Sequence, residues 1–211
     1  MNELLFVLLV LVSLIVVGII GAMAARRRWS AARRMGWVLG ASWAVYLVVV
    51  FAVAAATPQH IFVMNQERCF DEMCFSAVHV ESVAQLGPAS RPVRAAGRFY
   101  VVALRVTCRS RGRAQSEGGL HPLLWDSGRR FQVSREGMRA WQESNGRTAG
   151  LTDRLGPGES VVSVQIFDAP PDLRAPGLIL THGFTPGYFV IGECPLFHQP
   201  TIMRLDPSYS R

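Results

Sequence analysis

Two long apolar stretches near the N-terminus limit what this chain can fold into. Residues 4–25 and residues 36–56 contain no charged side chain. Each stretch has about the 20 residues that a helix needs to cross the hydrocarbon core of a bilayer, where a helix satisfies its own backbone hydrogen bonds. Residues 1–56 are therefore predicted to form a two-helix transmembrane hairpin, with the lipid bilayer as a partner.

The short loop between the two stretches indicates which side of the membrane the rest of the chain occupies. It carries five arginines and no acidic residue: Arg26, Arg27, Arg28, Arg33 and Arg34. Short arginine-rich loops stay in the cytoplasm, so both ends of the chain are expected on the extracytoplasmic side. A competing interpretation treats the second stretch as a cleavable signal, because arginines precede its apolar run and three alanines close it. Either outcome exports the C-terminal part.

Small residues recur at a spacing of four on both stretches. Gly36, Gly40 and Ala44 follow one side of the second stretch, and Gly18 and Ala22 follow one side of the first. This spacing lets helix backbones approach closely. The simpler interpretation is that the small residues pack the hairpin against itself, and the alternative is homodimerisation through the same face. Neither stretch contains an acidic or basic side chain, which argues against a role in transport.

The charge of the chain looks at first like a signal for nucleic-acid binding. The net charge is +7, but five of the arginines lie in the loop. Residues 57–211 hold 17 arginines against 14 acidic residues, a net charge of only +3. The basicity thus reflects membrane topology, and no nucleic-acid partner is expected.

All four cysteines lie in the exported part: Cys69, Cys74, Cys108 and Cys194. An even number of cysteines in an oxidising compartment predicts two disulfides, for which three pairings exist. We favour Cys69 with Cys74 and Cys108 with Cys194, because cysteines close in sequence meet most easily.

The exported part reads as one domain of short strands. Residues 57–68 are predicted to be a juxtamembrane linker, residues 69–206 the domain and residues 207–211 a tail. Between residues 98 and 109 an apolar side chain occupies every second position from Tyr100 to Cys108, the period of a strand with one face in a core. About seven such strands, separated by turns rich in glycine and proline, predict an antiparallel β-sandwich.

Two further elements of the domain are predicted from local patterns. Residues 75–83 alternate as a strand, with Ser76, Val78 and Val80 expected on one face. Residues 134–144 are expected to hold a short helix with Met138 and Trp141 facing inward.

Three segments in order carry a resemblance to a known family. They are the strand at 99–106, the hairpin at 125–131 with its Trp-Asp-Ser-Gly turn, and the Leu-Gly-Pro-Gly-Glu turn at 155–159 that leads into residues 164–170. Together they resemble the immunoglobulin-like domain-of-unknown-function family found in bacterial lipoproteins and membrane-anchored envelope proteins. The resemblance covers residues 69–206. It implies an immunoglobulin-like sandwich outside the inner (cytoplasmic) membrane, and it brings no catalytic residues. Cys108 departs from the pattern, where a polar residue is expected, and this departure favours a disulfide there.

The exported domain is expected to bind or scaffold another envelope protein or a cell-wall component. The best candidate for recognition is the loop that contains His182, Phe184 and Tyr188, because loops on a rigid sandwich carry function more often than its faces do. An enzyme is not expected, since the sequence has no Gly-x-Ser-x-Gly elbow, no phosphate loop and no dinucleotide fingerprint.

The alternative function is copper-dependent electron transfer. Cys194, His198 and Met203 resemble the C-terminal ligand loop of blue-copper proteins, which are also β-sandwiches. A second histidine ligand has no convincing candidate, and Cys194 cannot serve both copper and a disulfide. The main prediction therefore includes no metal and no other cofactor.

Overall fold

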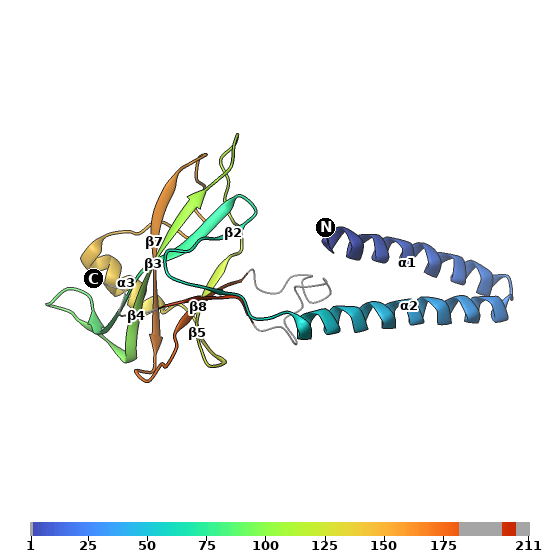
Figure 1. The fold of residues 1–211 in the computed structure, drawn as a ribbon, viewed down its shortest axis with the longest axis horizontal. Coiled ribbons are helices and arrows are strands. Elements are labelled where there is room, and N and C mark those ends of the chain that lie inside the picture. Colours follow the sequence, from blue (N-terminus) through green and yellow to red (C-terminus); the bar gives the residue numbers. More distant parts are fainter. Residues whose placement is uncertain (1, 182–199, 206–211) are drawn as a thin grey trace. The chain divides into compact units, whose positions relative to one another are not determined.

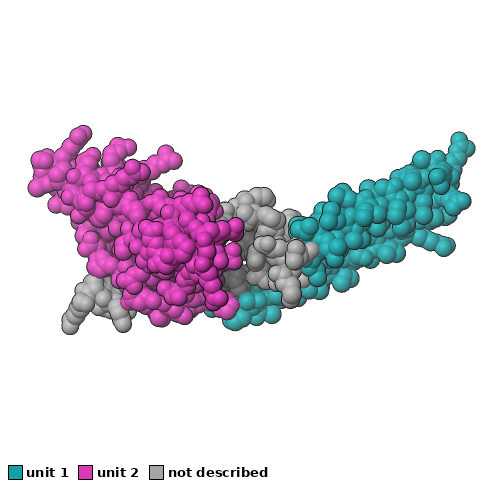
Figure 2. All heavy atoms as spheres, turned by 90° about the horizontal axis from the view of Figure 1, so that it is seen from above, with its two compact units in different colours: residues 1–59, 184–200 teal, residues 60–183, 201–211 magenta. Residues whose placement is uncertain are grey.

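The computed structural model describes residues 2–181 and 200–205 and contains two compact units, coloured separately in Figure 2. The first unit is built on two apolar helices and the second is a β-sandwich. The predicted architecture is confirmed.

The helical unit consists of α1 (Asn2–Ala25) and α2 (Trp29–Ala56), which lie side by side in Figure 1. Tyr46, Val50 and Ala54 of α2 are buried in their interface. Trp43 Nε1 donates a hydrogen bond of 3.0 Å to Ser13 Oγ across the two helices. An apolar seam and one polar contact thus hold the hairpin together.

The turn between the helices is shorter than the predicted loop, because α2 begins at Trp29 and includes Arg33 and Arg34. Arg28 N donates to Met23 O and Arg27 N to Ala24 O, both at 2.9 Å, which is the hydrogen-bond pattern of a Schellman motif. Arg27 has φ 58°, the left-handed conformation that this motif requires. The chain therefore reverses within three residues.

The small-residue stripes do not pack the hairpin against itself. A Cβ atom built at Gly18, Gly36 or Gly40 would meet no heavy atom within 4 Å. The simpler interpretation of the stripes is therefore wrong. The helices meet instead through the larger side chains of the seam.

The sandwich unit has nine strands in its described part, in two sheets. One sheet has the order β1-β9-β8-β5-β6, formed by Ile61–Phe62, Ile202–Arg204, Gly177–Thr181, His121–Asp126 and Arg129–Phe131. The other has the order β2-β3-β4-β7, formed by Arg68–Phe70, Met73–Leu86, Val93–Cys108 and Ser160–Ala169. Neighbouring strands are antiparallel except β1 and β9, which are parallel. Figure 1 shows both sheets.

The main core lies between the two sheets. Every second residue of β4 from Tyr100 to Cys108 is buried in it, as predicted. The predicted shared face of Ser76, Val78 and Val80 is wrong, because a β-bulge between Ala77 and His79 shifts the alternation of β3 by one residue. Ala77 and Val80 share the core instead.

Part of the predicted linker belongs to the sandwich. β1 lies within residues 57–68 and pairs with β9, and Met64 is buried in the main core. The compact unit accordingly begins at His60.

The predicted short helix is confirmed as α3 (Arg135–Asn145). The Ser134 side chain caps it by accepting a 3.1 Å hydrogen bond from Gly137 N. Met138 and Trp141 pack on Phe99 and Val101, which face away from the main core. Helix α3 therefore gives the β4–β7 sheet a second, smaller core on its outer face.

Candidate functional site

Most of the predicted recognition and copper residues lie outside the described residues. These are His182, Phe184, Tyr188, Cys194 and His198. The described residue of the copper alternative is Met203, which is 1% exposed in the main core. Its thioether packs among apolar side chains from both sheets, which is the usual environment of a methionine in a hydrophobic core.

The residues that flank the 182–199 segment are described, and one side chain contacts both flanks. Arg68 reaches from β2 toward the other sheet, where its Nη1 donates to Leu180 O at 3.3 Å and to Thr201 O at 3.5 Å. One guanidinium therefore joins the two sheets at the place where the segment leaves β8 and returns to β9. The position of Arg68 could not be predicted from the sequence, because nothing in the local pattern shows that it faces another sheet.

Arg68 is a half-buried cation. Its guanidinium carbon lies 4.4 Å from the centroid of the Phe70 ring, a cation–π contact. Burial lowers the pKa of Arg68 to about 10, so the side chain remains charged at neutral pH. No carboxylate of residues 2–181 and 200–205 is within ion-pair distance of it. Glu67, the nearest in sequence, pairs instead with Arg109, whose Nε donates to Glu67 Oε2 at 2.9 Å.

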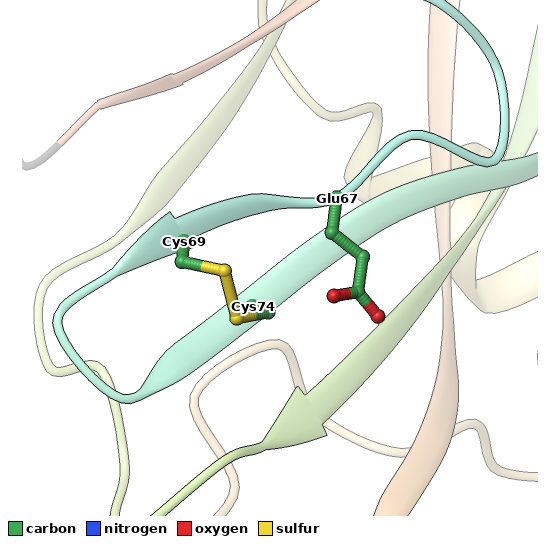
Figure 3. Close-up of side chains that lie close together, drawn as sticks. All are labelled: Glu67, Cys69 and Cys74. Carbon is green, nitrogen blue, oxygen red and sulfur yellow. A yellow bond between two sulfur atoms is a disulfide. The ribbon is translucent and has the colours of Figure 1, made fainter.

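The predicted disulfide between Cys69 and Cys74 is present, with an S–S distance of 2.02 Å. The two cysteines are directly opposite each other in the β2–β3 hairpin, and the Glu67 carboxylate lies beside them (Figure 3). Because both sulfurs are bonded to each other, neither offers a thiolate to a metal ion. The β2–β3 hairpin, which contains Arg68, is therefore covalently cross-linked.

Cys108 carries a free, buried thiol whose Sγ lies 3.3 Å from Ser110 Oγ. Its predicted partner, Cys194, lies outside the described residues.

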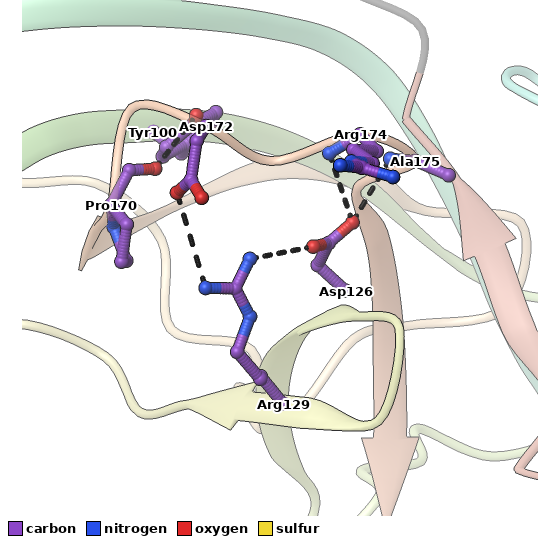
Figure 4. Close-up of polar contacts among 7 residues, drawn as sticks. All are labelled: Tyr100, Asp126, Arg129, Pro170, Asp172, Arg174 and Ala175. Carbon is purple, nitrogen blue, oxygen red and sulfur yellow. Dashed lines mark hydrogen bonds and ion pairs between the residues drawn. The ribbon is translucent and has the colours of Figure 1, made fainter.

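A second polar cluster ties the loop after β7 to β5, as Figure 4 shows. Asp126 is 1% exposed, and its Oδ1 accepts from Arg174 N at 3.1 Å and Ala175 N at 2.9 Å. Its Oδ2 accepts from Arg129 Nη2 at 2.9 Å. Nearby, Tyr100 Oη donates to Pro170 O at 3.3 Å.

Desolvation raises the pKa of the Asp126 carboxyl. The hydrogen bonds from Ala175, Arg129 and Arg174 lower it by more than desolvation raises it, so that the pKa lies below its ordinary value. The carboxylate is charged, and both of its oxygens accept hydrogen bonds. This cluster is suited to hold a loop. Ser127 beside it has φ 49°, a left-handed conformation that agrees with the predicted Trp-Asp-Ser-Gly turn.

The comparisons with known proteins yield structures and no family. No family model and no curated protein matches the sequence. A conserved hypothetical protein from Bacillus anthracis is 14% identical, with a TM-score of 0.46, over 58% of this chain and 92% of that one. An uncharacterized β-sandwich protein from Clostridium difficile is 14% identical, with a TM-score of 0.43, over 71% and 96%. The yjhA protein from Bacillus subtilis is 12% identical, with a TM-score of 0.42, over 69% and 99%.

Proposed function

We propose that this chain is a bacterial envelope protein whose two helices anchor it in the inner membrane and whose exported sandwich binds another envelope protein or a cell-wall component. Its role is binding or scaffolding rather than catalysis. The contact is made at the end of the sandwich marked by Arg68 and the 182–199 segment. The binding proposal rests on the position of Arg68 between the two sheets.

The anchoring role is supported by the surfaces of α1 and α2. Leu8, Ile15, Val38 and Val45 are each more than 60% exposed, along helices long and apolar enough to span a membrane. In water, such surfaces would be unfavourable by about 25 cal/mol for each Å² of apolar area. A bilayer removes this cost.

The binding role is supported by the chemistry around Arg68. A partly desolvated guanidinium with no carboxylate partner among the described residues has N–H groups that can donate to an anionic or carbonyl group, and Phe70 beside it supplies a flat apolar contact. Both features are common at binding interfaces, where arginine and aromatic residues are enriched. The Cys69–Cys74 disulfide links the two strands of the β2–β3 hairpin, whose strand β2 carries both residues.

Membrane topology is tested with reporters fused to the C-terminus of the full chain. Alkaline phosphatase becomes active only where its disulfides can form, so the fusion should be active and a matching fusion to green fluorescent protein should be dark. A bright fluorescent fusion with inactive phosphatase would place the sandwich in the cytoplasm and contradict the proposed export.

Partner binding is tested with the full chain in envelope membranes, by sedimentation with purified cell-wall sacculi and by chemical cross-linking in cells. We expect the double variant Phe184→Ala, Tyr188→Ala to lose the partner while the sandwich still folds. Arg68→Lys should weaken binding, because an ammonium cannot reproduce the planar guanidinium that faces both carbonyls. The matched control is Arg105→Lys, which changes an exposed arginine of β4 in the same way.

The outcomes separate the two partner classes. Sedimentation with sacculi identifies a cell-wall component, whereas a specific cross-linked band identifies an envelope protein. If the Phe184 and Tyr188 double variant and Arg68→Lys capture as much partner as the control, this end of the sandwich is not the binding surface.

A further inference from the structure

A groove lies between the end of α1 and the first turns of α2. It has a volume of about 410 Å³ and is lined by Met23, Ser30, Ala31, Arg34, Met35 and Val38. Four of these side chains are apolar. The other two offer a hydroxyl group and a guanidinium group, both of which can donate to an anion.

The charge around the groove is entirely positive. All five arginines of the turn and the start of α2 are exposed, and residues 4–56 contain no acidic residue. Within the part of the chain that the structure describes, none of these arginines forms an ion pair. Arg34 therefore borders the groove with its charge uncompensated.

Two tryptophans mark the level of this groove. Trp29 is 65% exposed and Trp37 is 78% exposed, and each is the sequence neighbour of a groove residue of α2, Ser30 and Val38 respectively. Exposed tryptophans of membrane helices gather where hydrocarbon gives way to headgroups. Val38, which lines the groove, is 66% exposed and begins the apolar surface of the helix. The groove thus offers a cation on one side and leads onto an apolar surface on the other.

We propose that this groove binds the headgroup of an anionic phospholipid from the leaflet at the arginine turn. Arg34 and Ser30 donate to the phosphate, and Met23, Met35 and Val38 contact the start of an acyl chain. A free phosphate ion would leave the apolar lining exposed to water, and only a lipid satisfies both parts of the groove. This proposal rests on the anchoring role proposed above.

The test uses the full chain in detergent micelles, with phosphatidylglycerol or phosphatidylcholine added, and native mass spectrometry to measure the fraction of protein that carries one lipid. The wild type should prefer phosphatidylglycerol. Arg34→Gln should lower the bound phosphatidylglycerol by about fivefold, the effect of losing one direct, solvent-exposed ion pair with the lipid phosphate. Arg33→Gln is the matched control, because it removes the same charge one residue away without touching the groove.

Each outcome decides the proposal. A loss with Arg34→Gln and little change with Arg33→Gln supports a built site. Equal losses mean that a diffuse positive charge attracts the lipid, and no preference for phosphatidylglycerol means that the groove is not a headgroup site; both results overturn the proposal. Resistance of the chain to carbonate extraction, measured on cell membranes that contain it, tests the anchoring role separately. An extractable chain would overturn both, whereas an inserted chain without lipid preference overturns only the lipid site.

Discussion

Replacing Asp126 by alanine should lower the free energy of unfolding of the sandwich by about 3 kcal/mol. The estimate follows from the two backbone N–H groups that donate to the Asp126 carboxylate, those of Arg174 and Ala175. A hydrogen bond to a charged group contributes about 1.5–3 kcal/mol. We use the lower end for each of the two bonds, because the loop residue Arg174 is exposed and water can replace part of what is lost.

The effect should depend on pH, because the pKa of Asp126 lies below its ordinary value of 3.8. A carboxyl group with a lowered pKa in the folded state stabilises the fold above its unfolded pKa, and this contribution is lost as pH falls through the folded pKa. The difference between the wild type and Asp126→Ala should therefore be constant from pH 7 to about pH 5 and shrink below about pH 4.

Both effects are measured by thermal unfolding of the full chain in detergent. Near-ultraviolet circular dichroism and tryptophan fluorescence report the unfolding. Trp125 precedes Asp126 on β5 and reports on this end of the sheet. For a domain of this size, 1 kcal/mol corresponds to about 3 °C, so the melting temperature should fall by about 9 °C.

The control variant is Asp172→Asn in the same loop. The Asp172 carboxylate is 71% exposed and lies 3.9 Å from Arg129, so its removal should leave the melting temperature unchanged. If Asp126→Ala melts within about 2 °C of the wild type at pH 7, or if the difference persists unchanged at pH 3, the buried carboxylate does not hold this loop as argued.

Two further predictions concern the same domain. Replacing Cys69 and Cys74 by serine should cost about 2 kcal/mol, the chain entropy of so short a loop, and an unchanged denaturation midpoint would show that the hairpin is held by its strand pairing alone. Gly137→Ala should destabilise the domain by about 1 kcal/mol despite its better helix propensity, because the new Cβ would lie 2.8 Å from Ile166 Cγ2. Gly112→Ala, whose Cβ meets nothing within 4 Å, should be neutral, and equal effects of the two substitutions would count against overpacking.

The sequence predicts those features of the fold that have a period or a composition of their own. The apolar helices follow from their length and lack of charge, and strand β4 follows from its alternation between Tyr100 and Cys108. Helix α3 follows from the spacing of Met138 and Trp141. The disulfide between Cys69 and Cys74 follows from their proximity in sequence.

The features that were missed depend on backbone conformation or on distant partners. The bulge after Ala77 reverses the faces of β3, and no residue type in that stretch requires it. Arg27 takes the left-handed conformation at a position where glycine is the usual residue. The sequence therefore has no glycine to mark the end of α1. β1 is only two residues long and exists because β9, far along the chain, pairs with it.

Arg68 belongs to the second kind. In the sequence it stands at the end of a polar stretch beside a cysteine, and local pattern alone places it in solvent. Its environment arises only when β2 pairs with β3 in one sheet while Leu180 and Thr201 come from the other sheet. A cation there has few hydrogen-bond acceptors around it. A hydrogen bond from it to a carboxylate or carbonyl group of a partner would therefore be stronger than one from an arginine in water. Arg68 thus joins the two sheets at this end of the sandwich, and in the binding role that we propose it is the residue expected to select the partner.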